Sequence, residues 1–321
     1  MRKPLCDAST LRYHMYMSLR SNINVGNQVA KTTARNRALC LLLSGVCIVS
    51  ITFPAYAALD KAAQAGFVPH KALYEIRMKT KKSSAKVSNI HGKMMYEWQP
   101  ACDAWISNHH FDMTYEYYES PPVRITSDFS NHESFDGKSF NYTTTRKTRD
   151  MIMGEVRGSV TGDIQNEGGK AIYTKPETLE YELPEGTLFP MAHTLGVLEK
   201  IKAGKKFYNA TIFDGSDEEG PVTVNSFIGK PETFHIPDAY KDDIDADLVS
   251  AKSWNIRLAF FPLNKYEVTS DYEMSLLFHE NGVISDMVVE YKDFSVVQKL
   301  VALEPMDGAC ETVNEKNDQN P

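Results

Sequence analysis

Residues 187–204 carry the one convincing helical pattern of hydrophobic positions in an otherwise strand-like chain. Apolar side chains recur there at steps of three and four residues, so they share one face of a predicted amphipathic helix. His193 and Lys202 fall largely on the other face. The predicted apolar face comprises Leu188, Met191, Ala192, Leu195, Leu198 and Ile201.

Residues at both ends of this segment fit a helix of these bounds. Thr187 is placed to cap its start, and Pro190 is tolerated because it lies in the first turn. Lys200 and Lys202 suit the negative end of the helix dipole, and Gly204 fits the left-handed position that ends a helix.

The remaining segments alternate between apolar and polar residues or are rich in β-branched and aromatic residues, as strands prefer. Asp136-Gly137 and Asn281-Gly282 are hairpin turn signals between two such pairs of segments. The predicted strands cover residues 70–80, 92–99, 104–118, 123–135, 138–147, 151–161, 170–175, 178–183, 206–213, 221–229, 254–261, 272–279, 283–291 and 294–303.

This order of elements lacks the alternation of strands and helices that builds a parallel sheet, so the predicted class is all-β, either barrel or sandwich. A single apolar helix among sheets must bury its face, and we expect the strands to wrap around it. The alternative is a helix lying on the outside of a sandwich. The stretch 229–247 is a predicted exposed loop because it holds Asp242, Asp243, Asp245 and Asp247.

The first part of the chain has the pattern of a secretory signal. Residues 38–53 are a continuous apolar run, preceded by Arg35 and Arg37 and followed by Pro54-Ala55-Tyr56-Ala57. We predict cleavage after Ala57. The expected organisation is a signal peptide at 1–57 with an over-long basic region, one β domain at 58–310 and a disordered tail at 311–321. Because the region before Arg35 is long, Met15 or Met17 is an alternative start.

Export decides how the charge and the cysteines are interpreted. The segment 1–57 holds seven basic residues and one acidic residue, so its removal changes the net charge from −7 to −13. This charge disfavours nucleic acid and anionic lipid surfaces as partners. Residues 79–82 are a candidate for a local basic patch despite this net charge, although a solvated turn is the favoured interpretation.

Cleavage would also leave two cysteines, Cys102 and Cys310. Two cysteines in an exported chain predict one disulfide, and two free thiols are the less favoured alternative. Neither Cys40 nor Cys47 follows the small-residue pattern of a lipidated cysteine, so the mature protein is expected to be periplasmic, soluble and not membrane-anchored.

Several stretches, in order along nearly the whole mature chain, resemble the EipB family of periplasmic cell-envelope integrity proteins of α-proteobacteria. The matching pieces are HKALYEI (70–76), HGKMMYEWQPACDAW (91–105), FDGKSFNYTTTR (135–146), LPEGTLFPMAHTLGVLEKIKAGKK (183–206), FDGSDEEGP (213–221) and ISDMVVEYKDFSVVQKLVALEP (284–305) with the later Cys310. The region before Arg35 departs from the family pattern.

This resemblance implies an open, spiralled antiparallel β-barrel with one amphipathic helix packed in its interior. It also implies a conserved disulfide, which falls on Cys102 and Cys310, and a role in envelope integrity together with a periplasmic TPR-repeat protein. The fold implied is similar to that of lipoprotein carriers that hold acyl chains. No enzymatic activity comes with the resemblance.

Candidate catalytic and metal-binding residues are sparse. The chain lacks the glycine-serine elbow, the paired-histidine zinc motif, a C-x-x-C pair and a phosphate-binding glycine loop, so no catalytic, cofactor or metal site is predicted. His109 and His110 would point to opposite faces of a strand and make a poor metal pair. The acids Asp214, Asp217, Glu218 and Glu219 favour a solvated turn over a calcium site.

Three functions compete at this point. The favoured one is a non-enzymatic periplasmic interaction protein that supports the envelope, as the export signal, the missing catalytic set and the resemblance indicate. The second is a carrier of a lipid or lipoprotein acyl chain, which the barrel class and the apolar helix favour. The third, an envelope hydrolase, has the weakest support.

Overall fold

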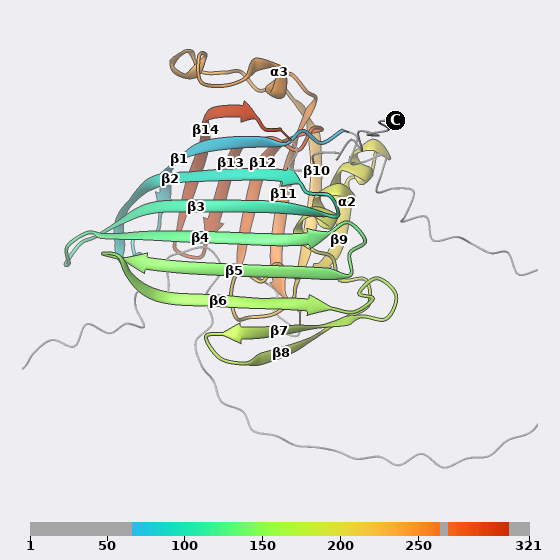
Figure 1. Ribbon diagram of the computed structural model, residues 1–321. Coiled ribbons are helices and arrows are strands. Elements are labelled where there is room, and N and C mark those ends of the chain that lie inside the picture. The colour runs from blue at the N-terminus through green and yellow to red at the C-terminus, as the bar shows by residue number, and fades with distance from the viewer. Residues whose placement is uncertain (1–65, 264–268, 308–321) are drawn as a thin grey trace, which may run out of the picture.

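A single antiparallel sheet of fourteen strands makes up most of the computed structural model, which describes residues 66–263 and 269–307 (Figure 1). The strands are β1 (His70–Lys81), β2 (Val87–Pro100), β3 (Ala104–Tyr117), β4 (Val123–Ser134), β5 (Ser139–Thr148), β6 (Met151–Thr161), β7 (Gly169–Lys175), β8 (Leu179–Leu183), β9 (Phe207–Ile212), β10 (Val222–Glu232), β11 (Ser253–Pro262), β12 (Tyr272–His279), β13 (Ile284–Tyr291) and β14 (Phe294–Pro305).

The strand order is β8-β7-β6-β5-β4-β3-β2-β1-β14-β13-β12-β11-β10-β9, so two meanders meet where β1 pairs with β14. In Figure 1 the strands from β2 to β8 face the viewer, and those from β9 to β14 lie behind them and run steeply across. The two ends of the sheet, β8 and β9, do not pair along a ladder. The predicted all-β fold, an open barrel with one helix, is confirmed.

A short segment after β8 partly bridges the opening between the two ends. The Leu188 N–H donates to the Thr211 carbonyl at 2.9 Å, and the Phe213 N–H donates to the Leu188 carbonyl at 2.9 Å. These bonds give Leu188 a parallel bridge to Ile212 at the edge of β9. Leu188 therefore belongs to this bridge and lies before the helix, so its predicted place on the helix face is wrong. Its side chain packs with Ala210, Val224 and Phe260.

Helix α2 (Pro190–Lys202) connects β8 to β9 and is shorter than the predicted segment 187–204. Its buried residues are Met191, His193, Val197, Leu198 and Ile201, and all but His193 belong to the main hydrophobic core with residues of β1 to β3 and β10 to β14. Leu195 is only half-buried and packs against this core. His193 was expected on the polar face, and its burial corrects that prediction.

The predicted cap at Thr187 is wrong. The capping position belongs to Phe189, whose side chain makes no cap bond, and the Thr187 hydroxyl donates to the Pro184 carbonyl at 2.7 Å. Pro190 does lie at the start of the helix. Gly204 has a φ of 67°, which is the left-handed backbone expected just after a helix end.

The excursion between β10 and β11 folds back onto the sheet. It contains the 3₁₀ turn η2 (Asp238–Tyr240) and the short helix α3 (Ala246–Val249), which lies beyond β14 in Figure 1. The predicted exposed loop is therefore correct for Asp242 and Asp243 and wrong for Ile244, which is buried and bridges Leu303.

Several predictions fall on residues outside the described part of the chain, namely the signal peptide at 1–57 and the tail at 311–321. The structure gives Cys102, in the turn between β2 and β3, as disulfide-bonded. Cys310 lies outside the described residues, so its pairing with Cys102 stays a prediction. Among the helices described, none has the length and apolar composition needed to cross a membrane.

The helix face provides a test of the core. Leu198 is 1% exposed, so Leu198→Asp would bury a charge among apolar side chains at a cost of several kcal/mol. We expect this variant to lose most of its folded population in urea unfolding followed by circular dichroism. Lys202→Ala alters an exposed side chain of the same helix and should unfold at the wild-type urea concentration. Equal losses in both variants would contradict the assigned core.

Candidate functional site

The N-terminus of α2 is held by a buried carboxylate from another element. Glu133, near the end of β4, is 2% exposed, and its two oxygens accept hydrogen bonds from the backbone N–H groups of Met191 and Ala192, each at 2.8 Å. The first turn of a helix leaves such N–H groups without partners, and the helix dipole favours a negative charge there. Glu133 therefore supplies from a distant strand the cap that Phe189 lacks.

The middle of the helix packs against β9 and β10. The rings of His193 and Tyr208 stack with centroids 5.6 Å apart, and His193 Nε2 lies 3.3 Å from Ser226 Oγ. Gly196 lets the backbone approach, because a Cβ there would be 2.7 Å from the Tyr208 hydroxyl oxygen. Burial lowers the pKa of His193 to about 4, so its ring is neutral at pH 7.

Polar side chains also occupy the inner face of strands β2 to β4. Ser107 Oγ donates to Asn131 Oδ1 at 2.8 Å, and the ring of His109 meets Tyr96 edge to face with centroids 4.8 Å apart. Burial lowers the pKa of His109 to about 4. His110, on the outer face, pairs with Asp128 at 2.6 Å, so the two histidines lie on opposite faces as their adjacent positions predict.

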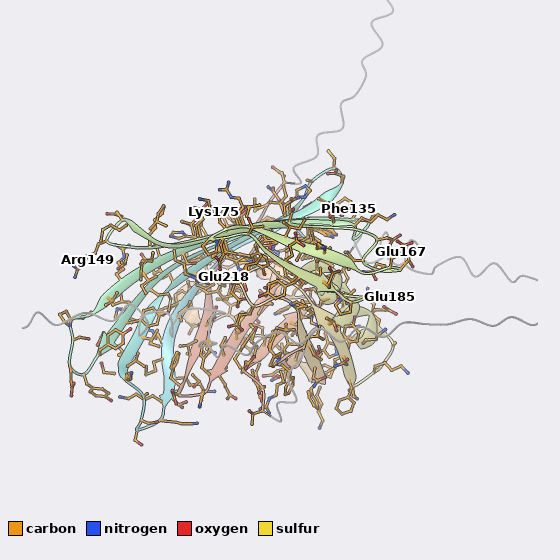
Figure 2. All side chains as sticks on the ribbon, turned by 90° about the horizontal axis from the view of Figure 1, so that it is seen from below. Phe135, Arg149, Glu167, Lys175, Glu185 and Glu218 are labelled. Atoms are coloured by element: carbon orange, nitrogen blue, oxygen red, sulfur yellow. The ribbon has the colours of Figure 1, made fainter. Side chains whose placement is uncertain are left out.

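The acidic loop after β9 packs against the inner side of β5 to β8. The Ser216 carbonyl accepts bonds from the Thr144 hydroxyl and the Arg146 guanidinium, both at 3.4 Å. The Tyr181 hydroxyl donates to the Glu218 carbonyl at 2.6 Å. Viewed from below in Figure 2, Glu218 lies midway between Arg149 and the opposite end of these strands.

This loop corrects the prediction of a solvated acidic turn. Of its four acids only Glu218 is exposed, and burial raises the pKa of both Asp214 and Asp217. Gly215, with a φ of 64°, lies so close to Tyr142 that a Cβ would be 2.3 Å from the ring. Within residues 66–263 and 269–307, no three histidine, cysteine or acidic side chains are grouped as metal ligands.

Comparison with known proteins decides the family. The EipB-like family model matches residues 61–307, which is well over half of the chain. The chain belongs to the EipB-like family. A similar curated protein is the cell envelope integrity protein EipB of Brucella abortus (strain 2308), which is 28% identical over 255 residues, or 78% of this chain and 88% of that protein.

A solved structure supports the same assignment. It is the crystal structure of a beta-barrel-like protein of domain of unknown function DUF1849 from Brucella abortus. It superposes with a TM-score of 0.68 at 26% identity and covers 75% of this chain and 99% of that chain. The chain therefore shares the beta-barrel-like fold of that protein.

Sequence reasoning missed the residues that hold the helix in place. The sequence patterns gave no role to Glu133 or Tyr208. A signal for Glu133 was present, because it occupies the same alternating face of β4 as the buried Ile125, Ser127 and Asn131. A carboxylate at an inward position of a strand needs a buried donor, and a helix N-terminus is one.

The Glu133 clamp can be tested by substitution. Glu133→Ala leaves the Met191 and Ala192 N–H groups without a buried acceptor, so we expect a loss of about 3 kcal/mol in the free energy of unfolding. Glu133→Gln keeps one acceptor oxygen and should lose less, about 1–2 kcal/mol. Urea unfolding measures both, and Glu182→Gln, which changes a side chain 81% exposed, serves as the control. Wild-type stability in Glu133→Ala would contradict the clamp.

The buried histidine predicts a pH dependence. The folded-state pKa of His193, about 4, lies below the ordinary value of 6.5, so the unfolded chain binds a proton more readily. Stability is therefore fully present above pH 6.5 and is lost as the pH falls toward 4, by up to about 1.4 kcal/mol per pH unit. His193→Phe keeps the stack on Tyr208 and should show a shallower loss between these pH values.

Comparing the two proteins isolates His193, because other groups titrate in the same range. His70, His109 and His279 also have lowered pKa values and act in the same direction, whereas the raised pKa values of Asp214 and Asp217 act in the opposite one. The difference in unfolding free energy between wild type and His193→Phe, measured at pH 7 and pH 5, removes these shared contributions. An unchanged difference would contradict a neutral buried His193.

Proposed function

We propose that this EipB-like protein supports the integrity of the cell envelope as a non-enzymatic periplasmic protein, exported through cleavage of residues 1–57. The observation that carries the proposal is the match of one family over residues 61–307, together with a relative whose name is cell envelope integrity protein. The non-enzymatic part of the proposal is supported by two buried polar side chains whose hydrogen bonds serve the fold. Glu133 holds the start of the helix, and His279 bonds Ser285 at 2.9 Å within the sheet.

We propose that it acts through a protein–protein contact with a periplasmic TPR-repeat protein. The segment that suits this partner is the arm formed by residues 233–249, which stands beside β14 in Figure 1. Its acids Asp238, Asp242, Asp243 and Asp247 are exposed. A cleft of about 360 Å³ separates the arm from β1, β13 and β14 and is lined by Phe234, Tyr240 and Arg77 among others. TPR repeats form extended concave surfaces that accept a protruding segment.

The second candidate function is transport of a lipid or lipoprotein acyl chain. It is favoured by Tyr96, Phe129 and Leu195, which pack beside the core clusters and stay only half-buried. Helix α2 fills the same space, so an acyl chain would have to displace it. Protein purified from the periplasm and extracted for mass spectrometry separates the two functions. Acyl chains in a fixed ratio to protein would favour the carrier.

Envelope function is tested in the producing bacterium. We expect deletion of the gene to lower plating efficiency on detergent, with recovery when the wild-type gene is restored. The variant Asp242→Lys with Asp243→Lys should accumulate normally but restore growth poorly and lose crosslinks to a TPR-repeat protein. Lys202→Ala is the matched surface control and should restore growth fully. A deletion strain that grows like its parent on detergent would contradict the proposed function.

A further inference from the structure

Three hairpin turns lie together at one end of the barrel. They join β1 to β2, β3 to β4 and β5 to β6, and these six strands are neighbours in the sheet. We call residues 79–86, 117–124 and 147–153 the basic rim. The Lys81 ammonium bonds the Tyr118 hydroxyl, and the Thr148 hydroxyl donates to the Arg124 carbonyl at 3.0 Å, so the three turns form one continuous surface. Arg149 marks this end in Figure 2.

The charge of the rim is opposite to that of the protein. The whole chain has a net charge of −7, and the rim has seven basic and two acidic residues. All the basic residues are exposed except Lys147, which is half-buried. The basic residues are Lys79, Lys81, Lys82, Lys86, Arg124, Lys147 and Arg149, and the acidic ones are Glu119 and Asp150.

Large apolar side chains project from the same rim. Tyr118 is 64% exposed, Met151 64%, Ile152 63% and Met153 44%. Among the described residues, the other large hydrophobic side chains this exposed are Phe207 and Phe227. The edge of β6 that faces β7 has no partner strand at residues 151–156, because β7 pairs with β6 only from Arg157 onward. Met151 and Ile152 are exposed next to Lys147 and Arg149, and contact with solvent alone does not favour such apolar side chains at the surface.

We propose that the basic rim docks on an anionic lipid bilayer, with Met151 and Ile152 entering the headgroup boundary. Lysines near an anionic membrane are attracted to it, and apolar side chains gain by leaving water. The overall negative charge does not prevent this contact, because salt screens charges more than about 8 Å away. The rim therefore presents its own positive field to the lipid surface.

Charge also decides against a second copy of the chain as the occupant. Two identical rims would bring seven basic residues against seven, which repel one another. The edge of β6 is further blunted by a register shift between Arg146 and Lys147, which leaves Met153 as an extra residue in the strand. An anionic bilayer needs neither strand pairing nor a matching surface.

Vesicle binding by the protein purified from the periplasm tests the proposal. We expect it to co-sediment at low salt with vesicles of phosphatidylglycerol and phosphatidylcholine in equal parts, and to stay in solution with phosphatidylcholine alone. The triple variant Lys79→Glu, Lys81→Glu, Lys82→Glu should bind the mixed vesicles about a hundredfold more weakly. Met151→Ser with Ile152→Ser should weaken binding without changing its salt dependence.

The matched control reverses three other exposed lysines, Lys202→Glu, Lys205→Glu and Lys206→Glu. It has the same net charge as the rim variant and lies beside Phe207, which is also an exposed large aromatic residue. It should bind like the wild type. The melting temperature of each variant should stay within a few degrees of the wild-type value. All these side chains are exposed, and a charge at a helix C-terminus such as Lys202, or an exposed contact such as that of Lys81 with Tyr118, contributes only a small part of the stability.

Three outcomes of the vesicle experiments would overturn the proposal. They are an absence of binding to the mixed vesicles, an equal loss of binding in the rim variant and the control, and binding that is indifferent to lipid charge. A stable dimer in sedimentation velocity without vesicles, abolished by Ile152→Ser, would assign the rim to a second copy of the chain instead. Binding that needs both the lysines and the anionic lipid supports the proposal.

Discussion

The contact between Glu133 and the first turn of α2 is the interaction on which the interior of this barrel depends. A buried carboxylate is costly unless it is hydrogen-bonded, and helix N–H groups are costly when they lack acceptors. Each group here satisfies the other, with both bonds at 2.8 Å. The contact fixes the helix start on β4, after which Met191, Leu198 and Ile201 can enter the main core.

An open sheet must fill its interior and protect its two ends, and this chain does both with segments that lie next to each other in sequence. The bridge at Leu188, helix α2, strand β9 and the acidic loop at 213–220 follow one another along the chain. Leu188 bonds the β9 edge, α2 fills one part of the interior, and the loop packs on the tyrosines of β5 to β8. A stretch of about thirty residues thus takes the place of ladder closure between β8 and β9.

Charge is distributed unevenly over the outside of the barrel, although the chain as a whole is acidic. The arm at 233–249 exposes acids, whereas the basic rim gathers lysines and apolar side chains on three turns. The arm and the rim both consist of connections between strands of the sheet. Loops held by a scaffold of strands often carry binding residues. The two contacts proposed above, one with a protein and one with an anionic bilayer, fall on different parts of the surface and are therefore compatible with each other.

Local patterns in the sequence determined the elements themselves. Alternation predicted the strands, Asn281-Gly282 and Asp136-Gly137 predicted hairpins, and the recurrence of apolar residues predicted the helix, because these signals depend only on near neighbours. The open barrel came from resemblance to a family, since strand alternation alone does not distinguish a barrel from a sandwich. Even the mistaken cap at Thr187 followed a local rule that usually holds.

The tertiary structure decided everything that rests on distant partners. Glu133 and Met191 are separated by 58 residues, and Thr144 and Ser216 by 72, so no spacing rule could connect them. The same limit explains why the helical pattern assigned His193 to the polar face, since the residues that enclose it, Tyr208 and Ser226, lie on other strands. It also explains why the sequence did not join the lysine-rich turn at 79–86 to the turn that carries Tyr118, since Lys81 and Tyr118 meet only in the folded chain. Burial and electrostatic environment belong to the folded surface as a whole, and a residue's neighbours in sequence do not specify them.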